Sequence, residues 1–205
     1  MKIDIILLSG TPASGKDTLT HKLTELDNRF VHFKKHKIAT GGKLDDTYYL
    51  ISKTEFDHMA ETNQFVQYHY RYDRGYGVSY VELERLKKEN KIPIIHVGKY
   101  ENIMKFRESG LKNILSILIY TDKKETEKRL NIRHKDNPYE IEKRLKAYDE
   151  EIEQLCEVYN KQKILDFDLI FINNFENIDI ATQLLYDKIT YFENNVNSIE
   201  EVLSC

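Results

Sequence analysis

The chain has 205 residues, of which 40% are hydrophobic and 11% aromatic, so it contains enough apolar side chains for one compact core, and we expect a single domain. The formal net charge of -3 excludes the strongly basic field that nucleic-acid-binding proteins use, and we expect no nucleic-acid partner. Two cysteines cannot form a disulfide framework, and the apolar run at residues 3–8 is too short to span a membrane. These features predict a cytoplasmic protein without a membrane partner.

The N-terminal segment has the pattern of a buried strand that leads into a helix. Residues 3–8 are continuously apolar and end at Ser9-Gly10, which is typical of a strand buried on both faces. Leu19, Leu23 and Leu26 then recur at helical spacing. The segment therefore predicts the first strand and helix of a parallel α/β sheet.

The segment from about residue 33 to 79 departs from this rhythm. It predicts a strand at 48–51, a helix at 52–63 and an alternating strand at 65–72. Alternation divides that last strand into a face that we expect to be packed, made of Val66, Tyr68, Tyr70 and Tyr72, and a polar working face made of Gln67, His69 and Arg71. We interpret the whole segment as an inserted subdomain.

Strands and helices alternate again after residue 80. The predicted helices lie at 81–90, 101–109, 123–133, 139–161 and 178–192, and the predicted strands at 93–97, 113–120 and 168–172. Strands that alternate with helices predict a three-layer fold, in which helices cover both faces of a parallel sheet. The core would comprise about residues 1–32 and 80–192, followed by a tail at 194–205.

A glycine-containing loop joins the first strand to the first helix. The loop has the pattern G-x-x-x-x-G-K, and we expect each of its residues to bind the phosphates of a nucleotide: Gly10, Thr11, Pro12, Ala13, Ser14, Gly15, Lys16, Asp17 and Thr18. The glycines let successive N–H groups converge, and the helix that follows directs its positive dipole end at the same point. The loop predicts a P-loop NTPase fold that binds ATP with Mg²⁺.

The position after the lysine departs from the strict pattern. A serine or threonine usually stands there as a magnesium ligand, whereas this chain has Asp17, followed by Thr18. Either side chain, or water held by Asp17, is a candidate for the metal role. No other spacing of His, Cys, Asp and Glu indicates a metal site.

From Met1 to about residue 174 the sequence resembles the guanylate kinase family. The likeness is carried by the phosphate loop and five further pieces: Tyr48-Tyr49-Leu50 with 52–56, Phe65-Val66-Gln67-Tyr68, Gly75-Tyr76-Gly77-Val78-Ser79, Arg129-Leu130 through Arg133 to Arg144-Leu145, and 168–173. The resemblance implies a core that holds ATP, a subdomain that binds a phosphorylated acceptor, and a helical lid at about 123–150. It also implies that Asn173, at the end of the last strand, lies beside the adenine site.

The same resemblance assigns Arg133 and Arg144 to catalysis, together with Lys16. Both arginines match family positions that clamp the transferred phosphoryl group, a task suited to the planar fork of arginine. The alternative is that each arginine pairs with Glu140, Glu142 or Glu151 on a solvated helix.

The acceptor side differs from the family pattern. The resemblance places the guanine-reading glutamate at Gln67, and a serine that follows Tyr-Gly at Val78. The aspartate of a nearby strand end falls at or near Gly98. We expect the acceptor to be bound by Lys35, Lys37, Tyr48, Gln67, His69 and Tyr76.

Three functions remain open from the sequence. The first is transfer of the γ-phosphoryl group of Mg·ATP to a nucleoside monophosphate. The second is a sugar-phosphate kinase, because Gly-Lys-Asp-Thr at 15–18 and Tyr-Gly-Val at 76–78 resemble the ribose 1,5-bisphosphate kinases of phosphonate metabolism. Such a reaction at a hydroxyl would need a base, for which Asp17, Asp45 and Asp46 are candidates. The third is a non-catalytic module that binds nucleotide on the same fold.

Overall fold

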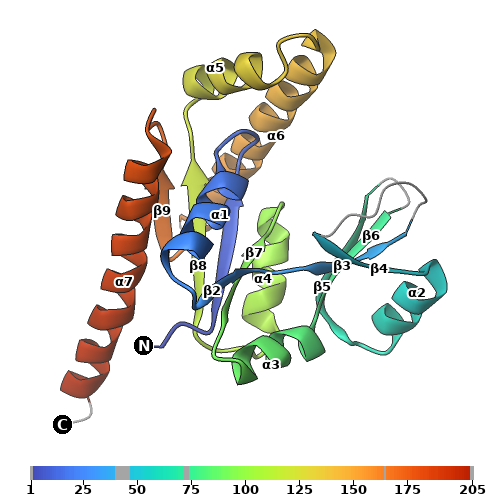
Figure 1. Cartoon of the computed structure of the whole chain (residues 1–205), viewed down its shortest axis with the longest axis vertical. Helices are drawn as coiled ribbons and strands as arrows, with labels where there is room; N and C mark the ends of the chain where they lie inside the picture. Colours follow the sequence, from blue (N-terminus) through green and yellow to red (C-terminus); the bar gives the residue numbers. More distant parts are fainter. Residues whose placement is uncertain (1, 40–46, 72–73, 164, 204–205) are drawn as a thin grey trace.

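The main sheet has five parallel strands, with a second sheet beside it (Figure 1). The computed structural model describes residues 2–39, 47–71, 74–163 and 165–203, and only the backbone of 195–203. The strands of the main sheet follow the order β2 (Phe30–His32), β7 (Ile92–His96), β1 (Ile5–Gly10), β8 (Ile114–Tyr120) and β9 (Leu169–Ile172). Parallel neighbours require crossover connections, which bring helices onto both faces.

Alternate residues of β1 point into two separate hydrophobic clusters. Ile6 and Leu8 pack with α1 (Lys16–Leu26) and α7 (Ile178–Leu203) on one face. Ile5 and Leu7 pack on the other face, where the cluster draws on α3 (Tyr80–Lys88), α4 (Tyr100–Glu108) and α6 (Pro138–Gln162). The predicted three-layer P-loop arrangement is confirmed.

The second sheet is mixed, and a helix covers one face of it. Its strands follow the order β4 (Tyr48–Ile51), β3 (Lys35–Ile38), β6 (Arg74–Ser79) and β5 (Phe65–Arg71), and its helix is α2 (Lys53–Glu61). Phe56 of α2 packs with Ile38 and Phe65. A Cβ atom added at Gly77 would lie 2.5 Å from the Phe65 ring, so glycine lets this aromatic ring lie against the strand.

Two helices form a hairpin whose tip lies beyond the carboxyl ends of the main strands, and the second of them runs back along the sheet (Figure 1). Asp122 caps α5 (Lys123–Arg133) by accepting a hydrogen bond from the amide of Glu125. Asn137 caps α6 in the same way, and Pro138 occupies the first turn. In the part of the chain described, no helix is both long and apolar enough to cross a bilayer.

The predicted division of β5 into two faces is wrong for Val66. A β-bulge between Phe65 and Gln67 shifts the alternation, so that Val66 packs in the main core while Phe65 packs against α2. Tyr68 and Tyr70 touch the Phe56 ring but remain 39% and 50% exposed, so the expectation of a packed tyrosine face is also wrong. Tyr72 lies outside the described residues.

Candidate functional site

The phosphate loop connects β1 to α1. Gly15 adopts a left-handed conformation with φ of 90° immediately before the helix, and no side chain caps the first-turn amides. An added Cβ at Gly10 would lie 2.2 Å from the carbonyl oxygen of Ile119. The loop therefore requires glycine at both positions, and it leaves N–H groups available for an anion.

Lys16 folds back over the loop that precedes it. Its Nζ donates hydrogen bonds to the carbonyl oxygens of Gly10 and Thr11, the latter at 2.9 Å, and to Ser14 Oγ at 3.2 Å. Burial lowers the pKa of Lys16, an effect opposed by the carboxylates of Glu151 and Asp17. A polyphosphate fits this loop, because it would supply acceptors for an ammonium group that now bonds only neutral oxygens.

Arg129 of α5 donates hydrogen bonds to the loop and to the end of β9, and the sequence did not reveal this role. Its Nη1 donates to the carbonyl oxygen of Ala13 at 3.2 Å, and its Nη2 donates to the carbonyl oxygen of Asn173 at 2.8 Å. Asn173, which we expected beside the adenine, is 1% exposed and donates from Nδ2 to the Ser14 carbonyl oxygen at 2.8 Å. The contacts recorded for Asn173 therefore hold the loop in place, and its role toward adenine stays a prediction.

The two candidate metal ligands differ in their contacts. Asp17 Oδ1 lies 3.4 Å from His96 Nδ1, whose ring also bonds Thr20 Oγ1 through Nε2 at 2.7 Å. The hydrogen bond from His96 lowers the pKa of Asp17 to about 2. Thr18 is exposed on the first turn of α1. Across the described ranges no three His, Cys, Asp or Glu side chains form a metal cluster. The carboxylate of Asp17 and the hydroxyl of Thr18 are oxygen donors, which is the ligand type that Mg²⁺ prefers.

All six predicted acceptor residues share one face of the second sheet. Lys37, Tyr76 and His69 lie directly opposite one another across β3, β6 and β5. The Lys37 ammonium lies 4.3 Å from the centre of the Tyr48 ring, and His69 stacks on Tyr76 at 5.4 Å. Lys35 follows the same alternation as Lys37, and its Nζ donates to the carbonyl oxygen of His96 at 2.5 Å. Asp45 and Asp46, the other candidate bases, lie outside the described residues.

Gln67 is buried at the side of a large cavity. It is 2% exposed, and its Nε2 lies 3.1 Å from Asn102 Oδ1 and 3.0 Å from His69 Nδ1. His69 and Asn102 line a cavity of about 820 Å³, which also includes Gly98 and one side of α6. A cavity of this volume is large enough for a nucleotide-sized ligand.

The two predicted lid arginines differ in their present contacts. Arg133 is exposed at the end of α5, where no hydrogen bond or ion pair joins it to the described residues. Arg144 Nε donates to Glu140 Oε1 at 2.7 Å, which is the surface ion pair considered as its alternative role. Such a partly exposed pair within one helix is weak, so a phosphoryl group can replace it.

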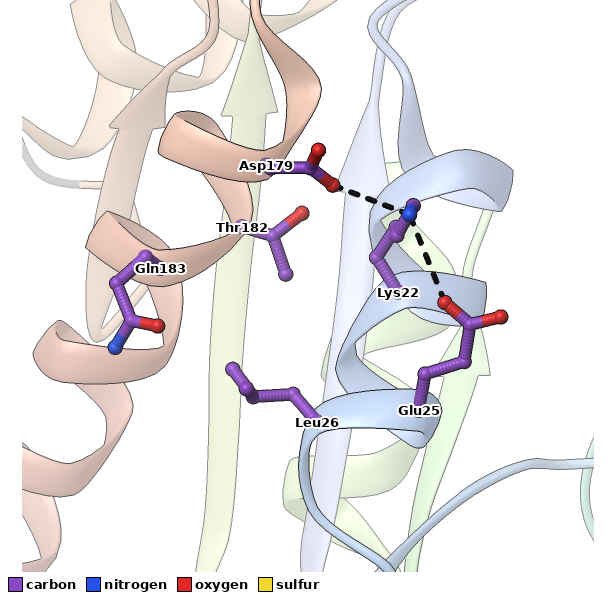
Figure 2. A pocket seen from close by; sticks show the side chains of 6 residues that line it. All are labelled: Lys22, Glu25, Leu26, Asp179, Thr182 and Gln183. Atoms are coloured by element: carbon purple, nitrogen blue, oxygen red, sulfur yellow. Dashed lines mark ion pairs between the residues drawn. The ribbon is translucent and has the colours of Figure 1, made fainter.

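A smaller hollow lies between α1 and α7, away from the loop. Figure 2 shows Lys22 of α1 pointing toward Glu25 and Asp179, with separations of 3.7 and 3.1 Å. The hollow has a volume of about 270 Å³. Because both carboxylates already pair with Lys22, this hollow carries none of the expected phosphate chemistry.

Comparison with known proteins identifies relatives of this chain. The family model described as guanylate kinase matches residues 2–189. The guanylate kinase of Helicobacter pylori (strain ATCC 700392 / 26695) is 32% identical over 178 residues, which cover 83% of this chain and 79% of that protein. The guanylate kinase of Blochmanniella floridana is 26% identical over 97% of this chain and 95% of its own length.

The fold is shared with solved structures, one of which is a guanylate kinase. The crystal structure of guanylate kinase from Anaplasma phagocytophilum superposes with a TM-score of 0.62 at 19% sequence identity, covering 95% of this chain and 88% of that one. At this identity the likeness concerns the fold alone.

Proposed function

Because the chain belongs to the guanylate kinase family of nucleoside monophosphate kinases, we propose that it transfers the γ-phosphoryl group of Mg·ATP to GMP. The observation that carries this proposal is the hydrogen bond from Lys35 Nζ to the His96 carbonyl oxygen. This bond joins β3 of the second sheet to the carboxyl end of β7. Strand β7 pairs with β1, which leads into the phosphate loop. Donor loop and acceptor face therefore lie at the same edge of the main sheet.

On the donor side, we assign Lys16 and the loop amides from Gly10 to Thr18 to the phosphates of ATP. Lys16 exchanges its loop carbonyl partners for phosphate oxygens, which increases its favourable charge interactions. Asp17 and Thr18 are the proposed magnesium contacts, and bound Mg²⁺ would neutralise charge that develops on the phosphate oxygens.

On the acceptor side, we assign Lys35, Lys37, Tyr48 and Tyr76 to the phosphate of GMP, and Gln67 with His69 to its base. The acceptor phosphate is already ionised at neutral pH, so its oxygen attacks without a general base. Arg133 and Arg144 would approach the transferred group when the α5–α6 lid closes, and closure would also exclude water. The products are ADP and GDP.

The proposal is tested by initial rates of ADP formation from Mg·ATP with GMP, AMP, CMP, UMP, dTMP and ribose 1,5-bisphosphate. Lys16→Ala serves as the blank, because it removes the ammonium group that would neutralise the phosphates. We expect turnover with GMP that is lost in Lys16→Ala. Turnover with ribose 1,5-bisphosphate in preference to GMP would contradict the proposal, as would nucleotide binding without turnover of any acceptor.

A further inference from the structure

The side chain of Asp17 is held by one residue of a neighbouring strand. Its Oδ1 lies 3.4 Å from Nδ1 of His96, which stands at the carboxyl end of β7. Among the described residues, His96 is the only one with which this side chain forms an ion pair or a hydrogen bond. The Asp17 side chain is 83% exposed, so without His96 it would sample several rotamers. The orientation of this carboxylate therefore depends on His96.

The ring of His96 is itself fixed by its neighbours. Its Nε2 lies 2.7 Å from Oγ1 of Thr20, a residue of α1 that is 0% exposed. The ring of His32 packs against it, with 4.6 Å between the ring centres. The backbone of His96 pairs with Leu8 of β1, and its carbonyl oxygen accepts the hydrogen bond from Lys35. The position of the ring therefore follows from the packing of the core.

The two ring nitrogens of His96 have opposite roles. A carboxylate oxygen can only accept a hydrogen bond, so Nδ1 carries the proton that faces Asp17. In the neutral ring Nε2 is then an acceptor, and the hydroxyl group of Thr20 donates to it. Thr20 therefore fixes the tautomer that directs an N–H group at Asp17.

This arrangement keeps the Asp17 carboxylate apart from the lysine that precedes it. Lys16 donates its hydrogen bonds to oxygens of the loop, and within the described ranges no hydrogen bond or ion pair joins it to Asp17. Lys16 thus retains its charge for phosphate oxygens. The exposed carboxylate retains lone pairs for a cation.

We infer that His96 is a positioning residue, which together with Thr20 holds the Asp17 carboxylate for the magnesium ion of Mg·ATP. His96 acts through Asp17 and touches neither the nucleotide nor the metal. The inference rests on the proposed function, which brings Mg·ATP to the loop. It adds that the series Thr20, His96 and Asp17 determines how strongly Mg²⁺ increases the affinity for ATP, a ratio that we call the magnesium gain.

Two amide substitutions distinguish the nitrogens of His96. Nδ1 is bonded directly to Cγ, so the side-chain amide nitrogen of His96→Asn takes its place and keeps a donor for Asp17. The amide of His96→Gln extends one bond further, takes the place of Nε2 and leaves Asp17 without its donor. We expect His96→Gln to lower the magnesium gain about tenfold and His96→Asn to lower it by less than about threefold.

Two further variants test the links on either side of His96. Thr20→Val keeps the volume of the buried side chain but removes its hydroxyl group, and it should lower the magnesium gain about threefold while ATP binding without Mg²⁺ stays the same. Asp17→Ala should lower the gain about tenfold or more. Adding His96→Gln to Asp17→Ala should cause no further loss, because His96 acts through Asp17.

The test is calorimetric binding of ATP in Mg²⁺ and in EDTA, for the wild type and these variants. His21→Gln is the matched control, because His21 Nδ1 also lies 3.4 Å from a carboxylate, that of Glu25, on an exposed part of the same helix. A gain that falls in His96→Gln and persists in His96→Asn and His21→Gln would establish the inference.

Several outcomes would overturn the inference. These are a wild type without a magnesium gain, a gain that is unchanged in His96→Gln, an equal loss in both amide variants, or a further loss in the double variant. If neither His96 variant folds, Thr20→Val decides, and an unchanged gain in that variant would overturn the inference.

Binding of ATP requires no acceptor, so the measurement separates this inference from the proposed function. If GMP is not phosphorylated but the gains follow the expected order, the proposed function fails and the role of His96 stands. If GMP is phosphorylated but the gain is the same in the wild type and His96→Gln, the proposed function stands and the role of His96 fails.

Discussion

Arg129 Nη1 donates a hydrogen bond to the carbonyl oxygen of Ala13, 3.2 Å away, and thereby ties α5 to the phosphate loop. Ala13 has a φ of 56°, a left-handed conformation that costs a non-glycine residue about 1–2 kcal/mol. The loop therefore holds a strained residue whose carbonyl group accepts a hydrogen bond from α5. This contact couples the order of the loop to the position of α5.

Replacing Arg129 by methionine should loosen the loop. We expect Arg129→Met to raise KM for ATP about tenfold, because the loop amides would have to be ordered when the phosphates bind. Lys128→Met is the control on the same helix, since Lys128 makes only surface ion pairs. Steady-state kinetics with varied ATP would measure the effect. An unchanged KM for ATP would show that ATP binding does not depend on the hydrogen bonds from Arg129 to the loop.

Gly77 should be intolerant of a side chain. A methyl group there would lie 2.5 Å from the Phe65 ring, and we expect Gly77→Ala to lower the free energy of unfolding by about 1–3 kcal/mol. Gly98→Ala is the matched control, because no atom lies within 4 Å of its added Cβ. Urea denaturation of both variants provides the measurement, and equal midpoints would refute the close contact.

Lys35 should make the activity toward GMP decrease at alkaline pH. Burial lowers the pKa of Lys35 from 10.5 to about 8, so the free enzyme loses this charge as the pH rises through 8. We expect kcat/KM for GMP to fall above pH 8, and the fall to disappear in Lys35→Arg, whose guanidinium remains charged. A profile of the wild type that stays flat to pH 9.5 would exclude Lys35 from binding the acceptor phosphate.

The same shift predicts the opposite trend for stability. Between pH 8 and 10.5 the unfolded chain keeps the Lys35 proton while the folded chain releases it. Stability rises with pH wherever the unfolded state binds more protons, so the free energy of unfolding should increase over this window relative to Lys35→Met. Denaturation curves at pH 8 and 9.5 measure the difference between the two proteins, and a difference that does not vary with pH would contradict the shift.

Asp17 and Thr18 can be distinguished by magnesium dependence. If Asp17 contacts the metal, Asp17→Ala should raise the Mg²⁺ concentration for half-maximal activity about tenfold or more, and Thr18→Ala should leave it unchanged. The assay varies free Mg²⁺ at constant ATP. A higher Mg²⁺ requirement in Thr18→Ala alone would show that Thr18, and not Asp17, contacts the metal. An unchanged Mg²⁺ requirement in both variants would show that neither side chain contacts it.

The sequence predicted the phosphate loop and the core well, because both depend on local patterns. Gly10 and Gly15 occupy the positions where close backbone approach and a positive φ require glycine. The predicted helix 123–133 matches α5, because Asp122 is a strong local cap. Three strands were missed, namely β2, β3 and β6. The residues of β2 and β3 carry no alternation that distinguishes a strand from a loop, and β6 contains two glycines, which are uncommon inside strands. The helix predicted at 178–192 runs on to Leu203.

The contacts between distant segments could not be predicted. The β-bulge between Phe65 and Gln67 takes Val66 off the face that holds Tyr68 and Tyr70, and nothing in the alternation of residues 65–72 reveals it. The pairing of Gln67 with Asn102 joins residues 35 positions apart on β5 and α4. Contacts of this kind depend on how the second sheet docks on the core, so only the structure could place Asn102 and Arg129 in the site.

The most direct test of the central claim follows the phosphoryl group itself. The protein would be incubated with ATP labelled in its γ-phosphate, Mg²⁺ and GMP, with Lys16→Ala in parallel, and the labelled products would be separated. Transfer of label to GDP by the wild type, and its loss in Lys16→Ala, is the result that we predict. Label recovered only as inorganic phosphate, or only in unreacted ATP, would contradict the assignment of this chain as a kinase of GMP.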